Sequence, residues 1–427
     1  MQKIKMFVKV SYFLAVILLL CFPMFSLVPA SPTINPKEVG NLEEPIDSFS
    51  ATTTSRKNTM DNNQEVSDKY YFISPTEKHQ ESIKEENSKA IMSESLLSLL
   101  STTPKDQWEE KTVRLIVVYD KKVSPTLRFS SNSMYGVKML KSLPIVYIKA
   151  TLNEAQRLMT LRGIKGVYLD RYIQFIDPSW KNTESMTETY PSEAYIGARY
   201  LQKLGINGSG IKIAIIDTGI DKTHPDLDDM DNDPSTNDPK IIAEQSFVDF
   251  DFDGTNDTDD SDQVGHGTHC AGIAAANGLL KGVAPGAYLM NARALDARGW
   301  AYVSWVVNAI DWAVNNGADI ISMSIGWAPS DVIALLNEAS NNAWERGTMV
   351  VVAAGNSGPS LTTISSPGMA SRALTVGASN ILNLTTNWSS RGPSTNNVID
   401  PDVLAPGEDI FSTVPQNGYK AYSGTSM

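Results

Sequence analysis

The chain has 427 residues, of which 42% are hydrophobic and 8% aromatic, and its formal net charge is −12 at pH 7. This composition excludes a chain that is disordered throughout, and it allows a large core plus at least one further domain. The acidic balance argues against nucleic acid or an anionic membrane surface as a main partner, because both bind basic surfaces.

The first 30 residues have the pattern of a secretory signal peptide. Three lysines precede the apolar run 11–28, and Val28-Pro29-Ala30 offers the small residues that a signal peptidase requires. We predict a signal peptide at 1–30, no membrane contact beyond it, and a secreted or cell-envelope location. An uncleaved membrane anchor is the alternative, because the run approaches the thickness of a bilayer.

A polar region follows the signal. Residues 31–105 are rich in Ser, Thr, Asn, Glu and Lys and contain few apolar clusters. Such a segment cannot bury enough apolar surface to fold, so we predict a mostly disordered spacer with one short helix at 93–100.

The pattern changes to a small α+β domain at 106–177. Thr151-Leu-Asn-Glu154 is a capping box that begins a helix, and Gly163 ends it. Apolar, β-branched runs predict strands at 112–120, 143–150 and 166–176. A polar linker or processing region at 178–194 then separates this domain from the rest.

Residues 195–427 predict a doubly wound, mostly parallel α/β sheet. Continuous apolar runs, which are typical of strands buried on both faces, occur at 211–217, 287–295, 318–326, 348–356 and 373–379. Two amphipathic helices alternate with them, at 303–317 and 331–347. In such a sheet, ligands bind beyond the carboxyl ends of the strands.

Three polar residues stand at those strand ends. Asp217, Ser324 and Asn356 each follow an apolar run. Any one of them alone is more often a turn former or a helix cap. Three at one sheet edge weaken that interpretation and indicate a site.

The segment GHGTHCAG (265–272) adds two histidines at the start of an apolar helix. A zinc site of the metalloprotease type would need them four apart with a glutamate between, which is absent here. A helix N-terminus disfavours imidazolium, so a base there needs an ionised partner such as Asp217. The segment SGTSM (423–427) offers Ser426 as a nucleophile that such a base would deprotonate.

Seven motifs in order then resemble the subtilisin family of serine proteases: IIDTGID (215–221), HPDL (224–227), GHGTHCAG (265–272), AAGNSG (353–358), SSRGP (389–393), PDVLAPG (401–407) and SGTSM (423–427). The resemblance implies a catalytic triad of Asp217, His266 and Ser426, with Asn356 in the oxyanion hole. His269, the second histidine, is more often packed than catalytic in this family.

The resemblance also implies the roles of the two domains. The small domain is similar to the family's ferredoxin-like inhibitory propeptide, which would act as an intramolecular inhibitor and make the protein a zymogen. Protein or peptide substrates would pair as an added strand with two edges, Gly299, Trp300 and Ala301 on one side and Ser324, Ile325 and Gly326 on the other.

The sequence departs from the family pattern at several places. Trp327 stands where glycine is common, and Trp300 is bulky beside the cleft. Cys270 fits a small buried hydrophobe, and it is the only cysteine left once Cys21 leaves with the signal. The family continues after the serine with an alanine-rich helix, so we expect the chain to be a fragment that is inactive as given.

Calcium is the expected cofactor. The family often uses the aspartate of HPDL, here Asp226, as a ligand. Asp249, Asp251 and Asp253 fall at the first spacings of a calcium-binding loop, although the match is poor. A solvated acidic loop is an equally good interpretation of this run.

Two other functions remain open. A subtilisin-like binding or scaffold protein without activity would keep this fold, and an exopeptidase would release short peptides from free N-termini. All the catalytic residue types are present, which favours the secreted serine endopeptidase acting through an acyl-enzyme intermediate.

Overall fold

The computed structural model describes residues 90–120, 134–176 and 192–427, apart from 232, 234, 254, 331 and 395–398. All of these belong to one compact unit. The predicted signal peptide, most of the predicted spacer and most of the linker lie outside the described residues. No helix in the described part is long and apolar enough to cross a membrane.

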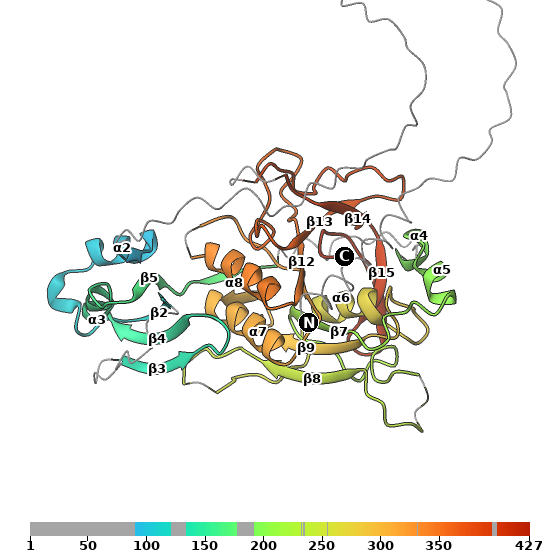
Figure 1. Cartoon of the computed structure of the whole chain (residues 1–427), viewed down its shortest axis with the longest axis horizontal. Helices are drawn as coiled ribbons and strands as arrows, with labels where there is room; N and C mark the ends of the chain where they lie inside the picture. Colours follow the sequence, from blue (N-terminus) through green and yellow to red (C-terminus); the bar gives the residue numbers. More distant parts are fainter. Residues whose placement is uncertain are drawn as a thin grey trace, which may run out of the picture. The chain divides into compact units, whose positions relative to one another are not determined.

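The core of the large domain (residues 192–427) is a seven-stranded sheet whose paired strands all run parallel, as the sequence predicted (Figure 1). Its strand order is β14 (Val403–Pro406), β13 (Leu374–Ser379), β12 (Met349–Ala353), β11 (Ile320–Met323), β7 (Lys212–Asp217), β9 (Tyr288–Arg293) and β8 (Ile241–Ser246). Chain order reverses between β11, β7 and β9, which opens a crevice at the carboxyl end of β7.

Helices cover both faces of this sheet. Ala214 and Ile216 of β7 belong to the apolar cluster that contains α7 (Val303–Asn315) and α8 (Ala334–Glu345). Ile213 and Ile215 point to the other face, into a cluster with α6 (His266–Ala275). Burial of each aliphatic side chain stabilises the fold by about 1.5–3 kcal/mol. The continuous apolar run of β7 therefore stabilises the packing on both faces of the sheet.

The small domain (residues 91–169) is a five-stranded sheet with two helices. Its strand order is β1 (Ile91–Met92), β5 (Ile164–Leu169), β2 (Thr112–Tyr119), β4 (Ile145–Thr151) and β3 (Met134–Met139). The helices are α2 (Glu94–Thr102) and α3 (Leu152–Leu158), and Thr151 caps α3 as its capping box predicted, with its hydroxyl 3.2 Å from the Glu154 N–H.

The small domain begins earlier than the predicted boundary at residue 106. β1 pairs in parallel with β5, and the Ser93 hydroxyl caps α2 by accepting the Leu96 N–H. Leu96 is completely buried in the core of the small domain. The polar composition around this helix concealed one apolar stripe, so the spacer prediction is corrected for residues 91–105.

The predicted strand 166–176 is two strands in two sheets. β5 ends at Leu169, and β6 (Tyr172–Gln174) pairs antiparallel with β10 (Trp300–Tyr302) of the large domain. Asp170 lies between them and is buried, because its carboxylate accepts the Ser304 N–H and hydroxyl at the start of α7. A single run of apolar residues therefore joins the two domains.

Several elements carry no strong pattern in the sequence. β8 and β14 are short edge strands, and β15 (Ile410–Val414) with β16 (Gly418–Tyr422) forms an antiparallel hairpin packed on α6. Three further short elements are η1 (Lys105–Gln107), α4 (Ser192–Tyr195) and α5 (Ala198–Lys203).

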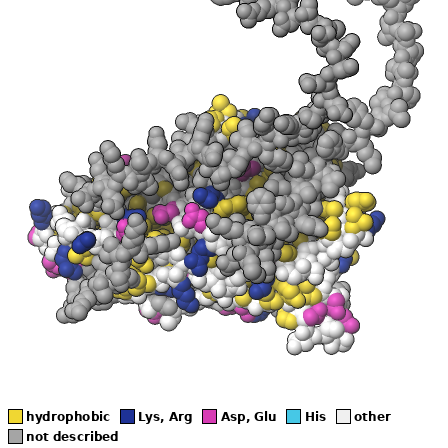
Figure 2. Space-filling view, in the orientation of Figure 1, with side chains coloured by type: hydrophobic (Ala, Val, Ile, Leu, Met, Phe, Trp, Pro, Cys, Tyr) yellow, Lys and Arg dark blue, Asp and Glu magenta, His cyan; other side chains and the backbone are white. Residues whose placement is uncertain are grey.

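The acidic run before β8 is a surface loop. Acidic side chains gather on the projection at the lower right of Figure 2, where Figure 1 places the loop preceding β8. Asp231 and Asp233 each accept a backbone N–H two residues further along the chain, at 2.9 Å. These aspartates stabilise local turns at the surface.

Candidate active site

The carboxyl end of β7 brings Asp217 to the N-terminus of α6, where His266 begins the helix. His266 Nδ1 lies 2.8 Å from Asp217 Oδ1 and 2.9 Å from Oδ2, and both side chains are about 1% exposed. Asp217 Oδ1 also accepts the Thr218 N–H at 2.7 Å. The predicted pairing of an acid with an imidazole is therefore formed in the fold.

Asp262 holds this pair in place, and sequence reasoning missed it. Its carboxylate accepts the Thr218 hydroxyl at 2.9 Å, next to Asp217, and caps α6 through the N–H groups of Val264, Gly265 and Thr268. It thus ties the end of β7 to the start of the helix. An aspartate shortly before a helix start was the available signal, but it lay within the acidic run.

The electrostatics of the pair favour a charged imidazole. Burial of the ring opposes its protonation, but the Asp217 carboxylate outweighs that cost and raises the pKa of His266 well above its ordinary value. The Cys270 thiol lies one helical turn further on, with Sγ 3.9 Å from His266 Nδ1. Cys270 is buried, as predicted for a small hydrophobe.

The two histidines of the motif face different partners. His269 Nε2 lies 3.1 Å from the carbonyl oxygens of both Ile410 and Lys420, on the β15–β16 hairpin. Burial lowers the pKa of His269 to about 3, so its ring is neutral and donates to the hairpin. Among the described residues, no group of potential metal ligands contains both histidines.

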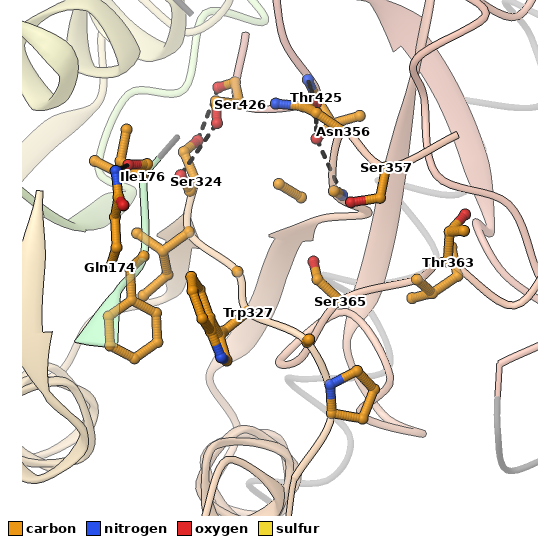
Figure 3. A pocket seen from close by; sticks show the side chains of 18 of the residues that line it. Gln174, Ile176, Ser324, Trp327, Asn356, Ser357, Thr363, Ser365, Thr425 and Ser426 are labelled. Atoms are coloured by element: carbon orange, nitrogen blue, oxygen red, sulfur yellow. Dashed lines mark hydrogen bonds between the residues drawn. The ribbon is translucent and has the colours of Figure 1, made fainter. Parts of the chain in front are cut away.

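Ser426 lies at the rim of the same cavity as His266. This cavity has a volume of about 510 Å³, and Ser324, Asn356 and Thr425 also line it. Ser426 Oγ donates to the Ser324 carbonyl oxygen at 3.1 Å, and the Ser426 carbonyl accepts from Ser324 Oγ at 2.8 Å (Figure 3). Cys270 Sγ, which neighbours His266, also donates to the Ser426 carbonyl at 3.5 Å.

Asn356 fixes the loop that carries Ser426. Its Oδ1 accepts both the N–H and the hydroxyl of Thr425, each at 3.0 Å. A Cβ built on Gly424 would lie 3.6 Å from Asn356 Nδ2. The amide oxygen is thus used for positioning, and the amide nitrogen is the group left to act as a donor beside Ser426.

The predicted substrate edges are already bridged by a strand of the chain itself, the cleft segment (residues 172–176). Gln174 pairs with Trp300, and Ile173 pairs with Ala301. Further along, Phe175 N–H donates to the Gly299 carbonyl at 3.0 Å. On the other side, the Gly326 N–H donates to the Phe175 carbonyl at 3.3 Å.

The remaining predicted edge residues line the cavity with this segment. Ser324, Ile325 and Gly326 face it together with Gln174, Phe175 and Ile176. Trp300 contacts the cleft segment directly, with its ring centroid 5.4 Å from that of Tyr172. One predicted edge, 299–301, thus pairs with the cleft segment, and the other, 324–326, lines the cavity beside it.

Trp327 shapes the far side of the cavity. Its backbone N–H and carbonyl pair with Ser366 at 3.0 Å each, and its ring lies beside the cavity, partly exposed (Figure 3). A Cβ on neighbouring Gly326 would lie 2.3 Å from Ser365 Oγ, so a larger residue there would require Ser365 to move. Ser365 is a lining residue that no motif predicted, because it stands in a run of small polar residues.

Asp226 does not fit a calcium ligand. It is buried, and its carboxylate oxygens accept the Leu279 N–H at 2.7 Å, the Leu280 N–H at 2.9 Å and the Tyr419 hydroxyl at 2.9 Å. Calcium requires further oxygen ligands around it, whereas this carboxylate is surrounded by hydrogen-bond donors. The structure therefore uses Asp226 to hold the β15–β16 hairpin and the loop after α6.

Replacing Asp226 by alanine is expected to lower the free energy of unfolding by about 3 kcal/mol or more, because three donors to a buried charge lose their acceptor. Asp226→Asn keeps an acceptor oxygen and should lose less. Urea unfolding followed by fluorescence measures both. If added calcium restored the lost free energy of unfolding to Asp226→Asn, or if a chelator destabilised the wild type alone, either result would show that Asp226 is a metal ligand.

The other predicted calcium ligands, Asp249, Asp251 and Asp253, do not all lie in one cluster. Carboxylate oxygens of Asp249 and Asp251 lie within 4.8 Å of each other and of Asp257, which was not predicted. Asp253 instead accepts the N–H and hydroxyl of Thr255 at 2.7 and 2.6 Å. The three predicted aspartates are thus not one ligand set, and calcium binding at this loop stays a prediction.

Comparison with known proteins gives a consistent result. A family model described as "Subtilase family" matches residues 208–427. The chain is 35% identical to Subtilisin E of Bacillus subtilis (strain 168) over 282 residues, which cover 65% of this chain and 67% of that protein. It is 39% identical to the Major intracellular serine protease of the same organism over 230 residues, covering 52% and 66%. It is 38% identical to Thermitase of Thermoactinomyces vulgaris over 224 residues, covering 52% and 71%.

Proposed function

Because this chain belongs to the subtilase family and is a serine-type endopeptidase, we propose that Asp217, His266 and Ser426 form its catalytic triad. The observation that carries the proposal is the buried Asp217–His266 pair at 2.8 Å, with Ser426 at the rim of the same cavity. The chain order of acid, base and nucleophile matches one of the known serine protease orders.

The reaction follows from these positions. His266 Nε2 takes the proton of Ser426 Oγ as that oxygen attacks the peptide carbonyl carbon, and Asp217 stabilises the imidazolium that forms. The ring then gives the proton to the leaving nitrogen as the C–N bond breaks. Water, activated by the same ring, hydrolyses the acyl-enzyme. Ser426 Oγ donates to the Ser324 carbonyl in this structure, a hydrogen bond that the hydroxyl gives up when its proton passes to the ring.

Asn356 is proposed as the oxyanion donor. Replacing it by alanine or by aspartate should lower kcat by about 10²–10³ with little change in KM, because both remove the amide N–H from the transition state. Aspartate retains the oxygen that holds Thr425, so it separates the donor from the positioning contact. Asn342→Ala on the surface of α8 is the control. Full activity of Asn356→Asp would refute the donor role.

We also propose that the small domain is an inhibitory propeptide that makes the protein a zymogen. The cleft segment pairs with β10 and occupies the groove where a peptide substrate would add as a strand. Cleavage within 178–194 would release it. A second docking contact supports this role: the Asp311 carboxylate on α7 accepts the N–H groups of Lys141 and Ser142 at 3.1 and 2.7 Å.

Secretion is proposed from the sequence of residues 1–30. The related proteins do not decide the location, because one of them is named as intracellular. Mass spectrometry of the exported protein, with an N-terminus after Ala30 or within 178–194, is the matching measurement.

Hydrolysis of an N-terminally blocked chromogenic peptide tests the function. An endopeptidase cleaves it, whereas an exopeptidase that needs a free N-terminus does not, and an inactive binding protein cleaves neither form. Fluorophosphonate labelling, with Ser426→Ala as the matched variant, identifies the nucleophile. Absence of both hydrolysis and labelling once the small domain has been removed would contradict the proposal.

A further inference from the structure

One arginine of the small domain is buried against the large domain, beside the end of β10 where Tyr302 pairs with Tyr172. The Arg114 side chain is 9% exposed, and its guanidinium carbon lies 3.7 Å from the centroid of the Tyr302 ring and 4.3 Å from that of Phe252. Trp305 lies behind them, with its ring 5.3 Å from Tyr302. The guanidinium is thus held by aromatic faces, which favour a flat cation.

The nitrogen atoms of this guanidinium also have partners. Nη1 donates to the Asp249 carbonyl at 2.9 Å, and Nη2 donates to the Ser304 hydroxyl at 3.4 Å. Nε donates to Asp170, at the junction between β5 and β6, at 3.1 Å, and Asp170 itself caps α7 through Ser304. A lysine could not donate hydrogen bonds in the same three directions, and its ammonium group could not stack on the aromatic rings as a flat guanidinium does.

The loop after β8 closes over the arginine. Phe252 has a positive φ of 64°, and a Cβ on Gly136 of β3 would lie 2.7 Å from its carbonyl oxygen. Phe252 thus packs against the bare backbone of the small domain while its ring covers Arg114. Asp249 and Asp251, which the sequence assigned to calcium, belong to this same loop.

We propose that the large domain carries an arginine-binding exosite, made by Phe252, Tyr302 and the Asp249 carbonyl, and that Arg114 occupies it to retain the small domain. This rests on the proposed function in one respect: the small domain acts as the inhibitor. The exosite begins at Tyr302, the last residue of β10, and continues onto the loop after β8, whereas the cleft segment pairs along β10. Retention of the cleft segment therefore depends on a contact made by Arg114, which lies outside that segment.

The test compares full-length variants by two measurements. Arg114→Ala and Phe252→Leu should each raise the rate of fluorophosphonate labelling at Ser426 at least tenfold, because the cleft segment leaves more often. Arg157→Ala is the control, since Arg157 lies on α3 of the same domain in an exposed ion pair with Glu154 and should label as the wild type. Guanidinium at 20–50 mM, but not methylammonium, should restore slow labelling to Arg114→Ala.

Hydrogen exchange at the amides of Phe175 and Ile176 measures how firmly the cleft segment is bound in the groove, and it does not depend on catalytic activity. We expect faster exchange at both amides in Phe252→Leu, whose small domain is unchanged in sequence, and in Arg114→Lys. Unchanged labelling and exchange in all three variants would overturn the exosite. If no variant labels while exchange rises as expected, the exosite stands and the nucleophile assignment fails instead.

Discussion

Replacing Asp217 by asparagine is expected to lower kcat by about 10⁴-fold, with little change in KM. The asparagine amide fits the same space but offers no charge, so the imidazolium formed during attack is no longer stabilised. It also presents a donor to His266 Nδ1, which favours the wrong tautomer. Steady-state hydrolysis of a blocked peptide by the processed enzyme measures the loss.

The pH profile tests the same contact. His266 must be neutral to accept a proton, and its pKa is raised, so kcat/KM should fall as the pH drops through a value above 6.5. Removing the charge of Asp217 removes the largest of the interactions that raise that pKa, so the acid limb should move to lower pH. Asp319→Asn, at the opposite end of the sheet, is the control. If the acid limb of kcat/KM in Asp217→Asn lay at the same pH as in the wild type, the Asp217 carboxylate would not be what sets the pKa of His266.

Replacing Ser426 by alanine should reduce kcat by about 10⁶-fold, because no oxygen remains to form the acyl-enzyme. Fluorophosphonate labelling should disappear as well. Ser423→Ala is the matched control on the same loop, since its hydroxyl accepts the Asp409 N–H and does not line the cavity.

The outcome against this prediction is equally specific. Labelling that persists in Ser426→Ala would place the nucleophile elsewhere. Loss of labelling in Ser423→Ala with unchanged stability would mean that the loop, and not one hydroxyl, is required. Thermal unfolding of both variants separates these cases from a failure to fold.

The sequence predicted the large sheet because its strands are buried on both faces. In β7, odd-numbered and even-numbered residues are both apolar, because helices cover both faces of the sheet. Such a continuous apolar run can be recognised in the sequence without knowledge of the neighbouring strands. β8 and β14 were missed because an edge strand has fewer buried positions and reads as a polar loop. The β15–β16 hairpin was missed because contacts with α6, distant in sequence, define it.

The site shows the same division. Motifs predicted Asp217, His266, Asn356 and Ser426, and the fold brings all four to one cavity or its wall. Asp262 was missed because its role is a set of hydrogen bonds, which composition does not encode. Asp226 was misassigned because its donors, Leu279, Leu280 and Tyr419, come from two other segments.

The junction at Asp170 shows what a linear pattern conceals. One apolar run, 166–176, predicts one strand, yet the chain changes sheets within it. The decisive contact is the capping of α7 by Asp170, which depends on a helix more than a hundred residues away in the sequence. No local preference identifies such a break.

The covalent continuity of the cleft segment with the large domain, through residues 177–191, has a kinetic consequence. A tethered ligand competes at an effective concentration on the order of millimolar, whatever the dilution of the protein. While the backbone at 177–191 is intact, diluting the sample cannot empty the groove; after one peptide bond is cut there, it can. Inhibition should be independent of protein dilution before that cut and should be relieved by dilution after it. That pair of results would show that the tether keeps the cleft segment in the groove.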